Sequence, residues 1–134
     1  AMALACLGRI QEAMKMNEHV FRLHPFHESA LNNQAKLLCD LGRYDEGIQL
    51  FRKILTKNPE HWEVVWNLSL VYLLLGDFTT GLDLYQHRLK VASFHQHHHP
   101  LSSPQWQGEP IEGKTLLVRC EQGYGDSIQF LRYI

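Results

Sequence analysis

The stretch that decides the fold is Leu41-Gly42-Arg43-Tyr44-Asp45-Glu46-Gly47. Counted 34 residues earlier, the same slots read Leu7-Gly8-Arg9-Ile10-Gln11-Glu12-Ala13. Counted 34 residues later, they read Leu75-Gly76-Asp77-Phe78-Thr79-Thr80-Gly81. A glycine that returns at one fixed period of this length is typical of a solenoid built from stacked units. The sequence therefore predicts a repeat protein over most of its length.

Each unit predicts two helices, as the unit at residues 28–61 illustrates. Leu31, Ala35 and Leu38 fall at i, i+4 and i+7, the spacing of one apolar helix face. Gly42 ends this first helix, because glycine adopts the left-handed conformation that lets the chain reverse at little steric cost. The second helix buries Ile48, Leu50, Phe51, Ile54 and Leu55 and ends at Asn58-Pro59. Applied to every unit, the pattern predicts helices near 1–7, 10–23, 27–41, 44–57, 61–75 and 78–92, and Ala1 then falls inside a helix.

The recurring positions resemble those of the tetratricopeptide repeat (TPR) family over roughly residues 1–93. The matching residues are Ala1, Ala35 and Ser69; Gly8, Gly42 and Gly76; Ala13, Gly47 and Gly81; Asn17, Phe51 and Tyr85; and Pro25 and Pro59. Asn17 departs from the aromatic slot of the family. Glycine at Gly47 and Gly81 replaces the usual alanine, which should cost about 1 kcal/mol of helix propensity each.

The resemblance implies an all-α solenoid of helical hairpins, about two and a half repeats long. A partial repeat at 1–27 would precede full repeats at 28–61 and 62–93. Another kind of helical-hairpin repeat is the alternative. Either way, the number of units is close to the minimum of about three that stacked repeats need for stability.

TPR arrays bind extended peptides or partner helices in the groove that their first helices line. The candidate peptide-binding residues are Asn32, Asn33, Lys36, Trp66 and Asn67. Asn33 and Asn67 occupy equal slots, and a column of side-chain amides can bond a peptide backbone without reading its sequence. This resembles the asparagine ladder of TPR-bearing glycosyltransferases, although asparagine is also common at this slot across the family. A ladder predicts that replacing both by alanine weakens peptide binding and changes the unfolding free energy by less than about 1 kcal/mol.

Two further groove features have alternative interpretations. Lys36 could meet a carboxylate, but the basic clamp of chaperone-binding TPR domains is not expected, because Trp66 and Leu70 occupy the matching slots. Trp62 and Trp66 lie four residues apart and share a helix face. They either pack within the solenoid or present an aromatic anchor to a partner.

Residues 94–113 predict a linker rich in histidine and proline. Its candidate metal ligands are His95, His97, His98 and His99. Imidazole suits zinc and nickel, but a structural zinc site needs four ligands in fixed tetrahedral geometry. We therefore expect adventitious metal binding at most, and the sequence predicts no cofactor.

From residue 114 the character of the sequence changes. Lys114–Cys120 is a short, mostly apolar run typical of a buried parallel strand, and a helix is expected from Ser127. Gly123 and Gly125 lie between them, where backbone N–H groups at a helix start can receive an anion or phosphate. Such a strand has no neighbours in this sequence, so we expect it to be disordered, to fold back on the solenoid or to pair with another molecule.

This segment and its flanks resemble bacterial TPR proteins that continue into a heptosyltransferase-like glycosyltransferase domain of the GT-B fold. The resemblance rests on Pro104, Trp106 and Gly108, on Gly113–Val118, and on Glu121–Tyr133. Residues 114–134 would be only the start of that domain. The resemblance implies Asp126 as the general base of such a parent enzyme, with helix capping as its alternative role. This chain alone is expected to be no enzyme.

Composition restricts the partners. The 134 residues are 45% hydrophobic with a net charge of −1, which gives no electrostatic reason to expect nucleic acid. No apolar run approaches a membrane span, and the first residues lack the basic region of a signal peptide. Cys6, Cys39 and Cys120 are odd in number and widely spaced, which favours a reducing, cytoplasmic compartment.

The function expected is a non-catalytic protein-interaction module that binds a peptide or a partner helix. The first alternative is the N-terminal part of a transferase that presents an acceptor to a nucleotide-sugar-dependent domain. The second is a self-associating scaffold.

Overall fold

The computed structural model describes residues 8–24, 26–92, 103–118 and 123–133. It divides the chain into two compact units, Ala1–Val91 and Ala92–Ile134. The expected first helix, at residues 1–7, lies outside the described residues, as does most of the histidine tract.

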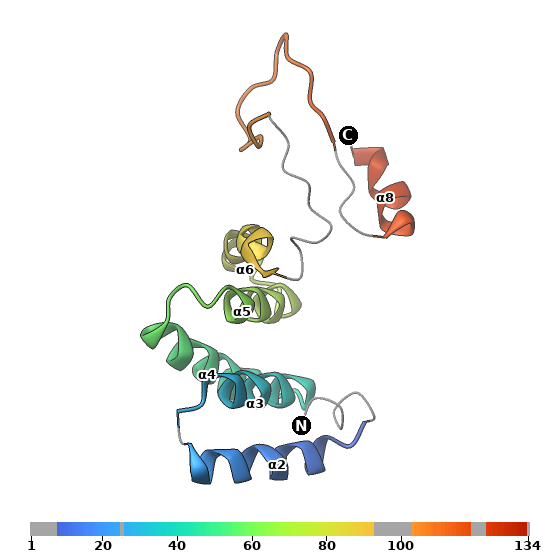
Figure 1. Ribbon diagram of the computed structural model, residues 1–134. Coiled ribbons are helices and arrows are strands. Elements are labelled where there is room, and N and C mark those ends of the chain that lie inside the picture. The colour runs from blue at the N-terminus through green and yellow to red at the C-terminus, as the bar shows by residue number, and fades with distance from the viewer. Residues whose placement is uncertain (1–7, 25, 93–102, 119–122, 134) are drawn as a thin grey trace. The chain divides into compact units, whose positions relative to one another are not determined.

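The first unit is a row of helical hairpins (Figure 1). Its elements are α2 (Ile10–Leu23), α3 (Glu28–Asp40), α4 (Tyr44–Lys57), α5 (Trp62–Leu74), α6 (Phe78–Tyr85) and the 3₁₀ helix η1 (Gln86–Lys90). α3 packs most extensively on α4, and α5 on α6, while α2 on α3 and α4 on α5 join neighbouring hairpins. The expected helix boundaries agree within two residues except for the last, which ends as α-helix at Tyr85 and continues as 3₁₀ helix to Lys90.

The glycine of each period reverses the chain. Gly8, Gly42 and Gly76 have φ angles of 73°, 76° and 83°, in the left-handed region that favours glycine. After α3, the Gly42 N–H donates to the Cys39 carbonyl and the Arg43 N–H to the Leu38 carbonyl, at 2.9 Å each. This pair of bonds is the Schellman motif, which satisfies carbonyls at a helix end. The same bonds recur one period later, so the sequence period is a backbone period.

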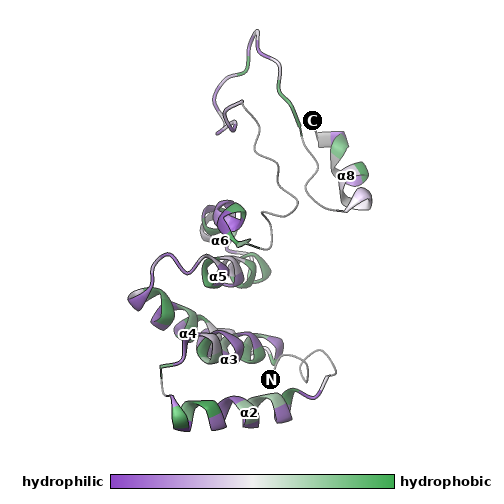
Figure 2. Cartoon of the chain, viewed as in Figure 1, coloured by the Kyte–Doolittle hydropathy of each residue, from purple (hydrophilic) through white to green (hydrophobic). Residues whose placement is uncertain are grey.

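The core of this unit lies where α3, α4 and α5 meet. Its buried side chains are Leu31, Ala35, Ile48, Phe51, Ile54, Val64, Leu68 and Val71. Figure 2 shows that α5 is apolar around most of its circumference, whereas α2 and α4 have separate apolar and polar faces. This fits the position of α5, which packs on α4 at one side and on α6 at the other.

The two glycines that replace alanine stand at the closest helix contacts. A Cβ atom at Gly47 would lie 2.5 Å from Cys39 Sγ, and one at Gly81 would lie 2.7 Å from Leu73 Cδ2. Such separations are too short for a real carbon contact. The helices within each hairpin therefore approach more closely than an alanine would allow, which is what the expected loss of helix propensity obtains in return.

The second unit contains α8 (Tyr124–Phe130) and the 3₁₀ helix η2 (Leu131–Tyr133). The expected strand is wrong for residues 114–118, which form no strand, and Leu117 is 66% exposed. The physical reason is the one that the sequence suggests: the described residues include no second strand to pair with its backbone donors and acceptors. No helix in the described ranges combines the length and apolar character that crossing a membrane requires.

Candidate functional site

Two of the candidate peptide-binding asparagines lie at the contact between α3 and α5. Asn32 and Asn67 are only 5% and 7% exposed. The Nδ2 of Asn67 donates to Oδ1 of Asn32 at 3.1 Å, and the Nδ2 of Asn32 donates to Oε1 of Glu63 at 3.3 Å. Glu63 and Asn67 are one helical turn apart on α5, so Asn32 bridges both. This chain of hydrogen bonds joins the first helices of successive repeats.

Asn33 and Asn67 therefore differ in surroundings, although they occupy equal slots. Asn33 is half-buried and lines a pocket, whereas Asn67 is buried and bonded within the solenoid. The expectation that replacing Asn67 leaves stability nearly unchanged does not fit a buried, hydrogen-bonded amide, because its removal leaves a partner unsatisfied. Contact of these residues with a peptide stays a prediction.

The other groove residues are half-buried. Lys36 lies one turn after Asn32 on α3, and Trp66 lies on α5 next to Asn67. Trp62 packs within its own hairpin: its ring centroid is 5.5 Å from that of His87, and Lys90 Nζ is 4.0 Å from the Trp62 ring centroid. Of the two roles expected for Trp62, the structure fits packing.

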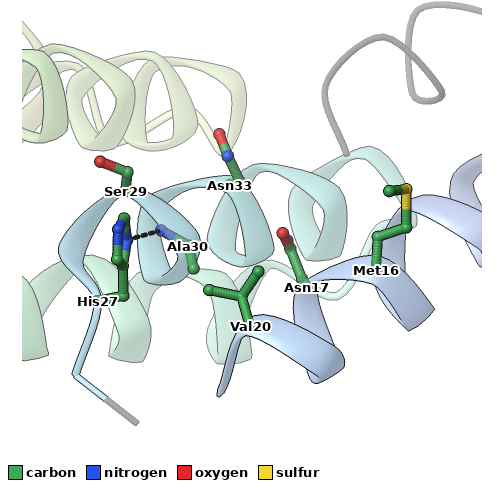
Figure 3. A pocket seen from close by; sticks show the side chains of 7 residues that line it. All are labelled: Met16, Asn17, Val20, His27, Ser29, Ala30 and Asn33. Carbon is green, nitrogen blue, oxygen red and sulfur yellow. Dashed lines mark hydrogen bonds between the residues drawn. The ribbon is translucent and has the colours of Figure 1, made fainter. Parts of the chain in front are cut away.

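A pocket of about 260 Å³ opens between α2 and α3 (Figure 3). Its lining residues are Met16, Asn17 and Val20 of α2, His27 before α3, and Ser29, Ala30 and Asn33 of α3. Val20 and Ala30 face each other from the two helices and form an apolar wall. Asn17, Ser29 and Asn33 supply polar groups. The pocket thus combines an apolar interior with side-chain hydrogen-bonding groups on its wall.

Asn17 explains why the pocket exists. It stands at the slot where the next repeat has Phe51, which is 1% exposed and fills the core. Asn17 is equally buried at 2% exposed, and its Nδ2 donates to Oε1 of Gln34 at 3.4 Å. Because asparagine is much smaller than phenylalanine, the space that an aromatic ring would fill stays open. The departure of Asn17 from the repeat pattern was the sequence signal for this pocket, although the pattern alone did not locate it.

The pocket floor and mouth are ordered by a helix cap. The Ala30 N–H donates to Nδ1 of His27 at 3.3 Å, so the imidazole satisfies one of the open amides at the start of α3. His27 is thereby held at the pocket edge in the tautomer whose Nδ1 accepts. A pocket of this size lies just below the range of about 300–1,000 Å³ typical of small-molecule sites, and it suits one or two amino-acid side chains.

The remaining candidate residues are not brought together. Gly123 has φ 68° and precedes α8, and a Cβ atom at Gly125 would meet open space. The side chain of Asp126 and the histidines His95, His97, His98 and His99 lie outside the described residues. Within the described part of the chain, no three side chains of histidine, cysteine, aspartate or glutamate are grouped as metal ligands would be.

Comparison with known proteins adds no family. No protein-family model matches the chain, and a search of curated proteins found no match either.

Proposed function

We propose that this chain is a protein-interaction module of the TPR type, which binds a segment of a partner protein at its helical repeats. The 34-residue register supports this proposal, because it holds for the helix boundaries, for the left-handed glycines and for the cap bonds. Repeats of this kind present an extended recognition surface made of equivalent helices.

The observation that carries the proposal is the pocket between α2 and α3. It is too small for a typical cofactor, yet it has an apolar wall and several side chains that can form hydrogen bonds. These are the properties of a site for side chains of a protein partner, where an apolar anchor enters a pocket and polar groups fix its orientation.

Panning of displayed peptides on the immobilised chain tests the proposal. Peptides that bind the natural chain should lose most of their binding to the Asn33→Ala variant, because Asn33 lies on the pocket wall. They should bind undiminished to Glu60→Ala, which changes an exposed residue in the turn between α4 and α5. Failure to enrich any peptide whose binding depends on Asn33 would contradict this function.

Two further proposals rest on particular features. A transferase parent is supported by α8, which begins directly after Gly123 where the resemblance expects a glycine turn followed by a helix. Sugar transfer by this chain alone would contradict its non-catalytic role. Self-association is supported by exposed apolar side chains on α5, α6 and their turn, which light scattering at increasing concentration would test. These side chains are Leu74, Leu75, Phe78 and Leu82.

A further inference from the structure

The pocket has an occupied counterpart within the same molecule. Each lining residue, advanced by the 34-residue period, falls on a residue of the next repeat. The counterparts are Leu50, Phe51, Ile54, His61, Glu63, Val64 and Asn67. They form no open pocket, because α3 covers them.

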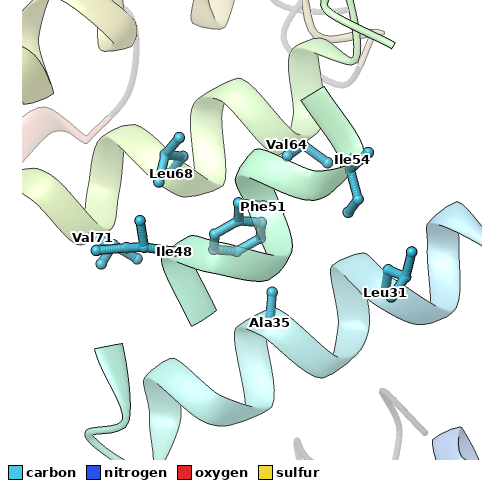
Figure 4. Packing of buried hydrophobic residues seen from close by; sticks show 8 residues of the cluster. All are labelled: Leu31, Ala35, Ile48, Phe51, Ile54, Val64, Leu68 and Val71. Atoms are coloured by element: carbon cyan, nitrogen blue, oxygen red, sulfur yellow. The ribbon is translucent and has the colours of Figure 1, made fainter. Parts of the chain in front are cut away.

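Two consecutive residues of α3 make this cover. Leu31 is 7% exposed and belongs to the same core cluster as Ile54 and Val64, and Figure 4 shows it facing Ile54. Asn32 accepts a hydrogen bond from Asn67 and donates one to Glu63. An apolar side chain followed by asparagine on one helical turn thus fills the counterpart of the pocket.

The pocket keeps the chemistry of that interface but has smaller walls. Val20 stands where the next repeat has Ile54, and Ala30 stands where it has Val64. The amide is kept, because Asn33 is the equivalent of Asn67. Among the described residues, none takes the place that Leu31 and Asn32 take in the next repeat. The open space therefore fits an apolar side chain at least as large as leucine.

We infer that the pocket between α2 and α3 is a docking seat for one helical turn of a partner protein, a large apolar residue followed by asparagine. The apolar side chain enters between Val20 and Ala30. The asparagine carboxamide accepts a hydrogen bond from Asn33, as Asn32 does from Asn67. The seat continues, one period earlier, the interface that α3 makes with α4 and α5. This inference rests on the proposed function and names the class of partner.

The probe is a synthetic peptide with the sequence of residues 27–41, blocked at both ends and carrying Cys39→Ser. Isolated helices of this length are marginal in water, so the titration extends to millimolar peptide and is followed by the backbone amide signals of the ¹⁵N-labelled chain. We expect saturable shifts at Val20, Ala30 and Asn33. A peptide with Asn32→Ala should bind about fivefold more weakly, the effect of one net hydrogen bond.

A gain-of-affinity variant makes the test sharper. Ser29 stands where the next repeat has Glu63, which accepts from Nδ2 of Asn32. Ser29→Glu should therefore raise affinity for the peptide about fivefold by adding that acceptor, and the gain should vanish with the Asn32→Ala peptide. The matched control is Gln49→Glu, which adds the same charge at an exposed site on α4 and should not change affinity.

Several results would overturn the inference. These are shifts confined to other helices, no shift at millimolar peptide, or equal affinities for the natural and Asn32→Ala peptides. Dimerisation of the chain that Val20→Asp abolishes would assign the seat to a second copy instead of a partner. If displayed peptides still bind in a manner that depends on Asn33, the proposed function survives and only the helical Leu–Asn motif is wrong.

Discussion

The contact between Gly47 and Cys39 gives a prediction whose sign distinguishes packing from helix propensity. Alanine has a helix propensity about 1 kcal/mol better than glycine, so propensity alone predicts that Gly47→Ala stabilises α4. In the structure, however, the added Cβ would lie 2.5 Å from Cys39 Sγ and 3.0 Å from the Ala35 carbonyl oxygen. The first separation requires atoms to move, and the second is a backbone contact that cannot rotate away.

The two effects can be compared in magnitude. Overpacking a core contact costs about 1–3 kcal/mol, and the simultaneous backbone contact favours the upper half of that range. After the gain in propensity, we expect Gly47→Ala to lower the unfolding free energy by about 1–2 kcal/mol. For a unit of this size, such a loss lowers Tm by about 5–10 °C.

A double-mutant cycle isolates the cause. In a Cys39→Ala background, the sulfur atom is gone and only the contact with the Ala35 carbonyl remains. Gly47→Ala should then change the unfolding free energy by less than about 0.5 kcal/mol, which corresponds to a coupling of about 1–2 kcal/mol between the two sites. Urea unfolding followed by circular dichroism measures all four proteins.

The matched control is Gly125→Ala. It makes the same change inside a helix, but no atom lies within 4 Å of the added Cβ, so no loss of stability is expected. If Gly47→Ala instead stabilises the chain, or if its penalty is unchanged in the Cys39→Ala background, then the close approach of α3 and α4 is not what requires glycine.

Three other perturbations follow from single contacts. Asn67→Ala should lower the unfolding free energy by about 1–3 kcal/mol in urea titrations, because the buried Asn32 loses its donor, whereas Asn33→Ala should cost less than about 0.5 kcal/mol. A hydrogen bond from the Thr80 backbone N–H lowers the pKa of Asp77 from its usual 3.8, so its contribution to stability is present above that pH and is lost as pH falls through the lowered value. Thermal unfolding from pH 6 to pH 2 should show this acid dependence weakened in Asp77→Asn. Burial, with a smaller effect from Asp40, raises the pKa of Cys39, so iodoacetamide at pH 8 should alkylate it more slowly than free cysteine in a variant that lacks the other two cysteines.

The regular part of the fold could be read directly from the sequence. Helix ends are local events: Gly42 reverses the chain whatever surrounds it, and the residue before Pro59 leaves helical geometry for steric reasons. This is why α2 and α4 begin and end at the expected residues. The last helix failed this reasoning, because no local signal marks the change from α-helix to 3₁₀ helix after Tyr85.

The expected strand shows the limit of local pattern. The apolar run from Leu116 to Val118 has the composition of a buried strand, but a strand forms only when its backbone groups are paired with a neighbour. The described residues contain no such neighbour, and these side chains are exposed.

The sequence by itself determined the period, the hairpins and the residues that share each slot. Only the tertiary structure decided what equal slots do, because that depends on the neighbour across each helix contact. Asn67 has Asn32 beside it and is buried in a hydrogen-bonded pair, whereas Asn33, one period earlier, faces a pocket. Asn17 is the reverse case: the sequence marked it as an exception, and packing turned that exception into the open seat between α2 and α3.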